Sequence, residues 1–318
     1  MVTPQKNLEP KQLNSKTITW GDLTWVDIVE PTEEAKKYLA ENYNFHPLDL
    51  DDCLSRRQLS KIDEYQQYLF VIFHLPVYDK AKRVSTTRQW SAFIGDKFLV
   101  TLHPTRLSAP DELFRECESS EEARKEYLSN GSGYLLYVIM DRVLDAYFPI
   151  LDKIMSLIED VEDNVFDEEI EEAKEISILR RDILTQRHVM FPTRTLLAEL
   201  ENKLKRFSKT DLSVYYGDLM DHMSKICDTL DECKEMIEVF KDADYVLSGY
   251  RSNNVSRILA VMLAVGLPFL VVSGVYGMRV ILPGGIDEGS PLTFVLLLVI
   301  IFIFIGATLY FFRRRHLI

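Results

Sequence analysis

One stretch, residues 214–278, constrains this chain most, because a polar heptad-patterned segment there runs into an uncharged one. Its apolar residues recur at alternating steps of four and three, as in the a/d seam of packed helices: Leu219, Met223, Ile226, Leu230, Cys233, Ile237, Phe240 and Leu247. Ile258–Tyr276 then carries no charge, and at about 1.5 Å per residue it can cross a hydrocarbon core of roughly 30 Å. We expect one helix, about 95 Å long, in several copies around an axis, because a solitary helix cannot bury such a seam.

A second uncharged segment, residues 292–312, predicts a second membrane span and therefore a hairpin. Basic residues lie before the first span and after the second, so the positive-inside rule places both termini in the cytoplasm. These residues are Arg251 and Arg257 on one side of the hairpin and the basic tail Arg313, Arg314 and Arg315 on the other. The connecting loop, 279–291, would lie outside with its acids Asp287 and Glu288.

The residues before the spans are strongly acidic. The chain has 37 Lys and Arg against 49 Asp and Glu, and all but two of the acids precede residue 251. An acidic body does not suit nucleic acid, whose phosphates attract Lys and Arg, and it suits a protein that meets cations. The four cysteines form no CxxC pair, which indicates reduced packing residues, and Met1–Lys16 lacks the apolar run of a signal peptide.

The first 130 residues mix strands with short helices. We predict strands at Leu23–Val29 and Tyr68–Val77, and a hairpin of Arg88–Ile94 with Lys97–Leu102 across a Gly95-Asp96 turn. Thr32 is expected to cap a helix, and His46–Asp52 to form a short helix with exposed acids. The Asn130–Gly133 segment would close this α/β unit.

The remainder is predicted to be helical. Tyr134–Phe166 reads as a helix bent at Pro149, and Glu168–Phe207 as a second long helix. The fold class is an α+β membrane protein, divided into an α/β domain (1–130), a helical hairpin (131–210), a stalk helix (211–257), a first span (258–278), the loop (279–291), a second span (292–312) and the tail (313–318).

Several ordered motifs resemble the CorA-type magnesium channel family over nearly the whole chain. The family's His-Pro-Leu-x-Leu-acid-acid stretch appears as His46–Asp52, and its Tyr-x-x-Asp-x-x-Asp-His stalk motif as Tyr215, Asp218, Asp221 and His222. The other matches are Ser252-Asn253-Asn254, Pro268, Tyr276-Gly277-Met278 and the basic tail. The resemblance implies a homopentamer in the lipid bilayer, whose first spans line a central pore for divalent cations, with Mg²⁺ as both cargo and regulator.

One residue departs from the family pattern. At the selectivity mouth, Tyr276, Gly277 and Met278 are followed by Arg279, where the family has an Asn that accepts hydrogen bonds from the water around Mg²⁺. Arg has donors and no acceptor, and its charge repels a divalent ion. Asp287 and Glu288 leave each loop net negative, so Arg279 could instead be paired and turned aside. Preserved divalent conduction, an altered ion choice and a non-conducting relative all remain open.

Helical spacing from the polar entrance predicts a pore-facing line. It comprises Asn253, Ser256, Leu259 or Ala260, Leu263, Leu267, Leu270 and Gly274, polar at the entrance and apolar beyond it. Such a line is typical of a hydrophobic gate that closes by dewetting. The alternative is that these leucines only pack against neighbouring helices, as most membrane leucines do.

The regulatory hypothesis rests on acids carried over by motif. The resemblance implies that Asp51 and Asp52 face Asp218 of the adjacent subunit, and that cytosolic divalent ions bridge them in the closed state. Asp221 and His222 are expected to tie the stalk to a neighbouring helix. A zinc site of His222 with Cys227 lacks the spacing of a stable ligand set.

No catalytic motif or organic cofactor is indicated, since the chain has no Walker loop, GxSxG or HExxH. The sequence favours a passive channel for divalent cations, Mg²⁺ first. A proton-coupled Zn²⁺ transporter, to whose family branch the Leu282–Gly285 loop is faintly similar, and a non-conducting membrane scaffold or ion sensor are the alternatives. The seam requires identical partners without fixing their number.

Overall fold

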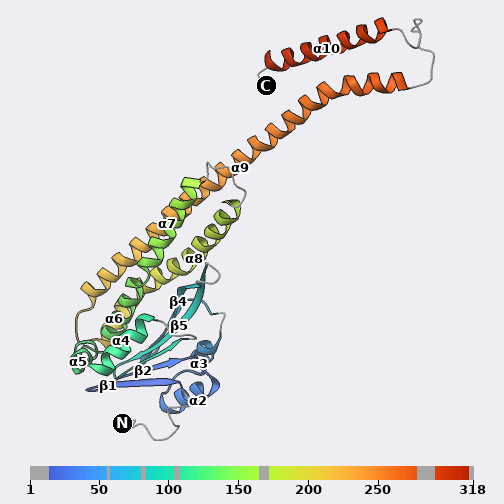
Figure 1. Cartoon of the computed structure of the whole chain (residues 1–318). Coiled ribbons are helices and arrows are strands. Elements are labelled where there is room, and N and C mark those ends of the chain that lie inside the picture. The colour runs from blue at the N-terminus through green and yellow to red at the C-terminus, as the bar shows by residue number, and fades with distance from the viewer. Residues whose placement is uncertain are drawn as a thin grey trace. The chain divides into compact units, whose positions relative to one another are not determined.

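The structure, a computed structural model, describes residues 14–55, 58–79, 84–103, 108–164, 172–277 and 291–314. The chain forms two compact units, Met1–Lys241 and Asp242–Ile318. Figure 1 shows the order of the elements along the chain. Of the sequence-predicted site residues, Met278, Arg279, Asp287, Glu288 and Arg315 lie outside the described residues.

A six-stranded sheet is the base of the first unit. Its strands are β1 (Ser15–Trp20), β2 (Leu23–Val29), β3 (Lys61–Glu64), β4 (Tyr68–Asp79), β5 (Val84–Gly95) and β6 (Phe98–His103), in the order β1-β2-β6-β5-β4-β3. Strands β2 and β6 pair in parallel, and the other four pairings are antiparallel. The strand predicted at Leu23–Val29 is confirmed at both ends, whereas the short edge strands β1 and β3 were not predicted.

The predicted hairpin of β5 and β6 is present with its turn shifted by one residue. Gly95 pairs with Phe98, so the turn is Asp96-Lys97 and not Gly95-Asp96. Gly95 is needed for space, because a Cβ there would lie 2.4 Å from Cζ of the Phe98 ring. Two non-bonded carbon atoms cannot approach so closely, so a larger residue at position 95 would require the Phe98 ring to move.

Each face of the sheet is covered by helices (Figure 1). Helices α2 (Glu33–Asn42) and α3 (Pro47–Leu54) pack on one face over buried residues such as Val26, Phe70 and Phe93. The opposite face, which carries Trp25, Phe73 and Trp90, shares a core with the later helices. As predicted, Thr32 caps α2, and its hydroxyl accepts a hydrogen bond from the backbone of Ala35.

The later helices of the first unit begin with α4 (Ser108–Ser119), α5 (Glu121–Leu128), α6 (Ser132–Asp145) and α7 (Phe148–Asn164). They continue with α8 (Glu172–Leu204), a 3-10 turn (Lys205–Phe207) and α9 (Ser213–Gly277), which runs on into the second unit. The single bent helix predicted for Tyr134–Phe166 is wrong, because α6 ends before Ala146 and α7 starts after Tyr147. Pro149 lies in the first turn of α7, where a missing N–H costs no helix hydrogen bond.

The Asn130–Gly133 segment is packed inside the first unit. Gly131, at φ 96°, precedes α6, and a Cβ there would lie 2.6 Å from the carbonyl oxygen of Phe207. The Ser132 hydroxyl donates a hydrogen bond to the Gly95 carbonyl at 2.6 Å. The sheet and the helices that follow it are therefore fastened together at this point.

The heptad seam of α9 is buried within one chain. Leu219, Met223, Ile226, Leu230, Cys233 and Ile237 are at most 1% exposed, and most of them join the core formed with α6, α7 and α8. Phe240 is half-buried. The inference that this seam needs other copies of the chain is therefore wrong over Leu219–Ile237, since the seam faces helices that precede it in the same chain.

In the second unit, α9 continues to Gly277 and is followed by α10 (Pro291–Arg314). Among the described residues one segment, Ser252–Gly274, has the length and apolar composition of a membrane span, and none of it is buried in the chain. Its 23 residues would extend about 35 Å as a helix. The predicted second span, 292–312, lies within α10, and its role as a span stays a prediction.

Candidate cation-binding sites and membrane span

Helix α3 carries the first set of predicted acids, and its start is fixed by local chemistry. His46 caps the helix, with Nδ1 accepting a hydrogen bond from the Leu48 backbone at 3.3 Å, and Pro47 takes the first helical position. The His46 backbone N–H donates to the Tyr68 hydroxyl at 2.8 Å. This strand residue therefore positions the acidic helix.

The expectation that all acids of His46–Asp52 are exposed is wrong for Asp49. This side chain is 2% exposed and accepts hydrogen bonds from the hydroxyls of Tyr65 (3.1 Å) and Tyr68 (2.9 Å). Burial raises the pKa of Asp49, and the two tyrosine hydrogen bonds act in the opposite direction. Asp49 thus anchors α3 to β4, and it is not available to an ion.

Asp51 and Asp52 lie next to lysines of the same chain. Lys36 of α2 donates a hydrogen bond to Asp51, and Lys61 Nζ lies 2.7 Å from Oδ2 of Asp52. The Asp51 side chain is 54% exposed and that of Asp52 is 18% exposed. Asp51 is therefore the more accessible of the two predicted ligands.

The third predicted ligand, Asp218, belongs to a second cluster. One ligand atom each from Asp141, Asp218 and His222 lie within 4.8 Å of one another, in an arrangement that could hold a metal ion. His222 Nδ1 is 3.9 Å from Oδ1 of Asp145 and 4.0 Å from Oδ1 of Asp141. Burial, followed by the neighbouring Asp145 carboxylate, raises the pKa of Asp141, as expected where like charges gather.

Asp221 and His222 were both expected to tie the stalk to a neighbouring helix, and the cluster confirms this for His222 only. The His222 ring faces two aspartates of α6 and meets the edge of Phe148 of α7. Cys227 is fully buried in the core. Asp141 and Asp145 were not predicted as site residues, although their spacing of four places them on one face of α6.

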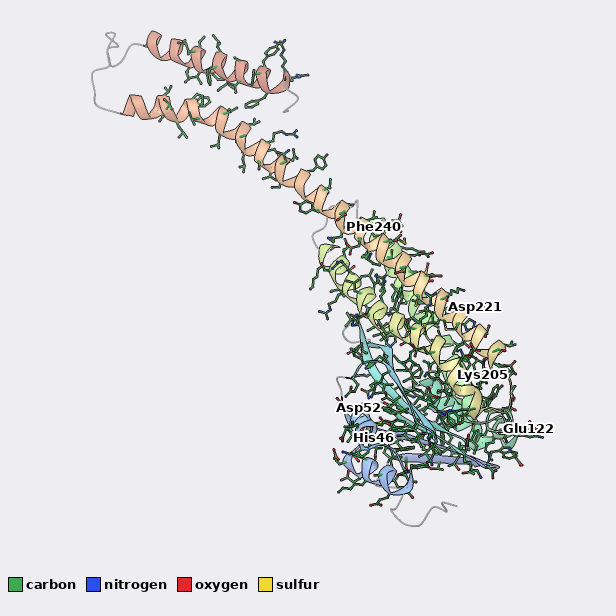
Figure 2. All side chains as sticks on the ribbon, turned by 180° about the vertical axis from the view of Figure 1, so that it is seen from behind. His46, Asp52, Glu122, Lys205, Asp221 and Phe240 are labelled. Carbon is green, nitrogen blue, oxygen red and sulfur yellow. The ribbon has the colours of Figure 1, made fainter. Side chains whose placement is uncertain are left out.

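The two clusters lie apart within one chain. Figure 2 labels His46 and Asp52 on α3 and Asp221 on α9, at different sides of the first unit. Asp221 is exposed. The predicted meeting of Asp218 with Asp51 and Asp52 is one between neighbouring subunits, and it stays a prediction.

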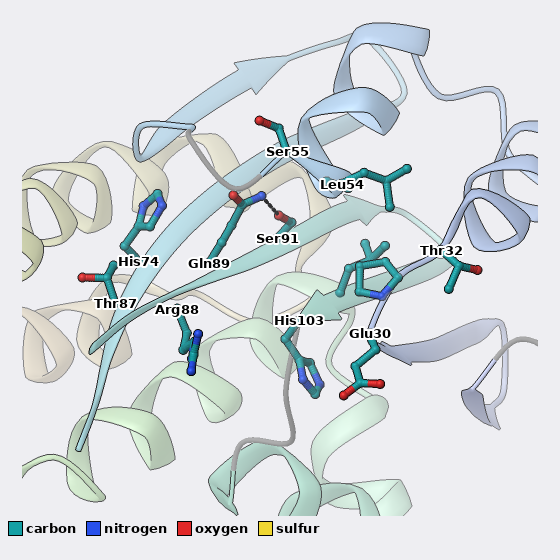
Figure 3. A pocket seen from close by; sticks show the side chains of 13 residues that line it. Glu30, Thr32, Leu54, Ser55, His74, Thr87, Arg88, Gln89, Ser91 and His103 are labelled. Carbon is teal, nitrogen blue, oxygen red and sulfur yellow. Dashed lines mark hydrogen bonds between the residues drawn. The ribbon is translucent and has the colours of Figure 1, made fainter. Parts of the chain in front are cut away.

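A cavity of about 650 Å³ opens at the carboxyl ends of the parallel strands β2 and β6 (Figure 3). Its lining includes Glu30 and His103, and the end of α3 contributes Leu54 and Ser55. Glu30 has a left-handed φ of 56°, and its backbone N–H donates to the His103 carbonyl at 2.8 Å. The side chain of His103 is also paired, with its Nε2 3.2 Å from Oδ1 of the buried Asp27. The cavity contains none of the sequence-predicted site residues.

The predicted pore line lies on the segment Ser252–Gly274. Because α9 is continuous, its three- and four-residue steps place the predicted residues on one face of the helix. All are exposed in the single chain: Asn253, Ser256, Leu259, Leu263, Leu267, Leu270 and Gly274. Residues off the line, such as Val255 and Met262, are equally exposed, so exposure alone does not select a pore face.

The ends of this segment carry the remaining predicted residues. Tyr276 and Gly277 form the last turn of α9, so the predicted mouth begins where this helix ends. Arg313 and Arg314 close α10, and cations at that position interact favourably with the negative end of the helix dipole.

The first unit carries a carboxylate and histidine cluster that could hold a metal ion, and α9 continues from it into an unburied apolar segment long enough to span a membrane. A family model described as CorA-like Mg²⁺ transporter protein matches residues 20–314. The chain belongs to this family, whose members are membrane transporters and not enzymes.

Relatives and solved structures agree with this assignment. The cobalt/magnesium transport protein CorA of Thermotoga maritima is 24% identical over 84% of this chain and 74% of its own length. The zinc transport protein ZntB of Pectobacterium atrosepticum is 22% identical over 70% of this chain and 65% of its own. The complete structure of the CorA magnesium transporter from Methanocaldococcus jannaschii matches with a TM-score of 0.75, at 22% identity over 93% of this chain and 92% of that one.

Proposed function

We propose that this divalent cation transporter is a passive channel for hydrated ions, Mg²⁺ first. The observation that carries the proposal is the continuity of α9, which runs from the acidic first unit through the 23-residue unburied apolar segment. An inside-negative membrane potential favours cation entry by about 2.3 kcal/mol per charge per 100 mV, so transport needs no other energy source.

The proposed assembly is a homopentamer in the cell membrane, with α9 lining the pore and α10 as an outer second span. The proposal is supported by the apolar surface of Ser252–Gly274, none of which is buried by other residues of the same chain. Asn253 and Ser256 would form a polar entrance, and Leu259, Leu263 and Leu267 a gate that closes by dewetting. Both termini would be cytoplasmic, with the basic end of α10 inside.

Regulation by cytosolic divalent ions is proposed at the acids of the first unit. Asp51 and Asp52 of one subunit would face Asp218 of the next, and Asp141 and His222, whose ligand atoms lie near that of Asp218, could supply further ligands. Clustered carboxylates repel each other without an ion, and a shared divalent cation would hold neighbouring subunits together in the closed state.

Flux into liposomes tests the proposal. Purified protein should admit Mg²⁺ under an inside-negative potential, with Na⁺ and Cl⁻ excluded and without dependence on a proton gradient. Uptake of Zn²⁺ that requires a proton gradient would instead support the second candidate, a proton-coupled Zn²⁺ transporter, which the similarity to ZntB favours. Absence of flux for all of these ions would support a scaffold or ion sensor.

Arg279 gives the proposal a sharper test, because Arg lacks the acceptor that hydrated Mg²⁺ needs. If Arg279 obstructs the mouth, Arg279→Asn should raise Mg²⁺ flux into liposomes several-fold. Unchanged flux would indicate that Arg279 is paired and turned aside, and that backbone carbonyls hold the water of the ion. Lys97→Gln, a change at an exposed lysine of the first unit, is the matched control for loss of one positive charge.

A further inference from the structure

Asp51 and Asp52 are adjacent in sequence but are held by different contacts. Gln58 donates a hydrogen bond to Oδ1 of Asp52 at 2.7 Å, and Lys61 Nζ lies 2.7 Å from Oδ2. The Asp52 backbone carbonyl also accepts a hydrogen bond from Gln89 at 2.9 Å. Both carboxylate oxygens are therefore engaged within the chain, and Asp52 is a fixed part of the junction between α3 and the sheet.

Asp51 is bound differently. More than half of its side chain is exposed. Its Oδ1 accepts a hydrogen bond from Lys36, which belongs to the neighbouring helix α2. Lys36 itself is 29% exposed, so the pair lies at the surface, where its partners can exchange. Exposed ion pairs of this kind are weak, because the ammonium group must be immobilised and solvent screens the attraction.

We infer that Lys36 is a tethered competitor for the divalent cation at Asp51, and that it sets the ion concentration at which this carboxylate is occupied. The inference rests on the regulatory site proposed above. An ammonium group on Oδ1 occupies the place where a cation would bind. A divalent ion must displace Lys36 or bind beside its charge, and both reduce affinity.

Lys36 differs from a bound ion because its ammonium group is covalently attached to the chain. An ammonium has three donors but is anchored to its own chain, so it compensates Asp51 without joining the ligands of a second subunit. A divalent ion prefers several oxygen ligands and can join two subunits. Lys36 therefore maintains an ion-free state in which Asp51 is compensated and the subunits are unbridged. Raising the divalent ion concentration replaces one contact with the other.

Binding measured on the full-length protein in detergent tests this inference independently of flux. Mg²⁺ binding would be followed by titration calorimetry, and Mn²⁺ binding by electron paramagnetic resonance. Lys36→Met should lower the apparent dissociation constant for both ions about three- to tenfold, since it removes the competitor and one positive charge. Lys37→Met is the matched control, because Lys37 is the exposed neighbour on the same helix, and it should change the constant less than about twofold.

The Asp51→Asn background separates a local effect from a general one. If Lys36 acts through Asp51, the double variant with Lys36→Met and Asp51→Asn should have the same dissociation constant as the single variant Asp51→Asn. If Lys36→Met increases affinity as much in the Asp51→Asn variant as in the parent protein, the inference is overturned, because the effect would then come only from the change in surface charge. If Asp51→Asn itself leaves binding unaltered, the proposed regulatory site fails. If it weakens binding while Lys36→Met has no effect, the competitor role alone fails.

Discussion

Asp49 and Asp51 lie two positions apart on α3 and have opposite surroundings. Asp49 is buried under two tyrosine hydroxyls, whereas Asp51 is exposed beside Lys36. On a helix, residues two positions apart point in different directions, so one acid can be structural while the other meets ions. Chemical type alone could not separate them, and the hydroxyls that mark Asp49 come from strand β4 and the residues just before it.

The buried acid gives the first prediction. Asp49→Ala should lower the free energy of unfolding by about 2 kcal/mol, because the hydroxyls of Tyr65 and Tyr68 lose their acceptor in a buried setting. Thermal unfolding of the full-length protein in detergent measures the change. Asp51→Ala, at an exposed position, is the control and should shift stability by less than about 0.5 kcal/mol. Equal effects of the two changes would contradict the anchoring role.

His74 gives a prediction for pH. Burial lowers its pKa from the ordinary 6.5, and its Nδ1 lies 3.0 Å from the Ser60 hydroxyl. The unfolded chain therefore binds a proton at His74 more readily than the folded chain does. The contribution of neutral His74 to the free energy of unfolding is present above about pH 6.5 and is lost as the pH falls below that value. His74→Gln should flatten the loss of thermal stability between pH 7 and 5. An unaltered pH profile would show that His74 does not contribute.

At the scale of elements, sequence pattern predicted best the strands that are buried on both faces of the sheet and the long continuous helix α9. Leu23–Val29, the β5–β6 hairpin and the continuity of α9 all follow from local periodicity. The turn position was missed because Gly95 makes room for Phe98, a packing requirement between residues that pairing brings together. The break between α6 and α7 was missed because proline in a first turn resembles proline at a bend.

The seam of α9 shows the limit of a periodic pattern. Alternating steps of four and three specify that a helix has a packed face, but not whether the partner belongs to the same chain. Here α6, α7 and α8 cover that face, with Ile226 and Leu230 fully buried. The acidic cluster escaped prediction for a related reason, since Asp141 meets His222 only when α6 and α9 pack together.

This intrachain packing gives the third prediction. Ile226→Ala should lower the stability of the first unit by about 2–4 kcal/mol through the cavity that it leaves. Val239→Ala, at a side chain that is 64% exposed on the same helix, should cost less than about 1 kcal/mol. Thermal unfolding in detergent compares the two variants. Subunit number, followed by native mass spectrometry, should be the same for both at temperatures where they remain folded.

At the scale of the whole molecule, the unpartnered segment Ser252–Gly274 separates this protein from a soluble one. A surface of this kind is stable only in lipid or against copies of itself. Native mass spectrometry of the detergent-purified protein should therefore find an oligomer, with five copies expected from the proposed pore. A monomer under conditions that retain bound lipid would remove the central passage and with it the gate at Leu259, Leu263 and Leu267.

The fifth prediction concerns orientation. Reporter fusions at residue 1 and after residue 318 should both be active on the cytoplasmic side, as required if Ser252–Gly274 and α10 both cross the membrane. A fusion in the loop between α9 and α10 should report the outside. Opposite locations of the two ends would show an odd number of crossings, and α10 would then have another role.

The enclosed seam of α9 bears on how such a protein is made. A subunit whose stalk already rests on its own neighbouring helices can reach a finished shape during synthesis, before it meets any sister chain. If the chain assembles as proposed, assembly would join subunits whose first units are already folded, and its rate would depend on their concentration in the membrane. Newly synthesised subunits would then exist in the membrane as folded monomers before they assemble.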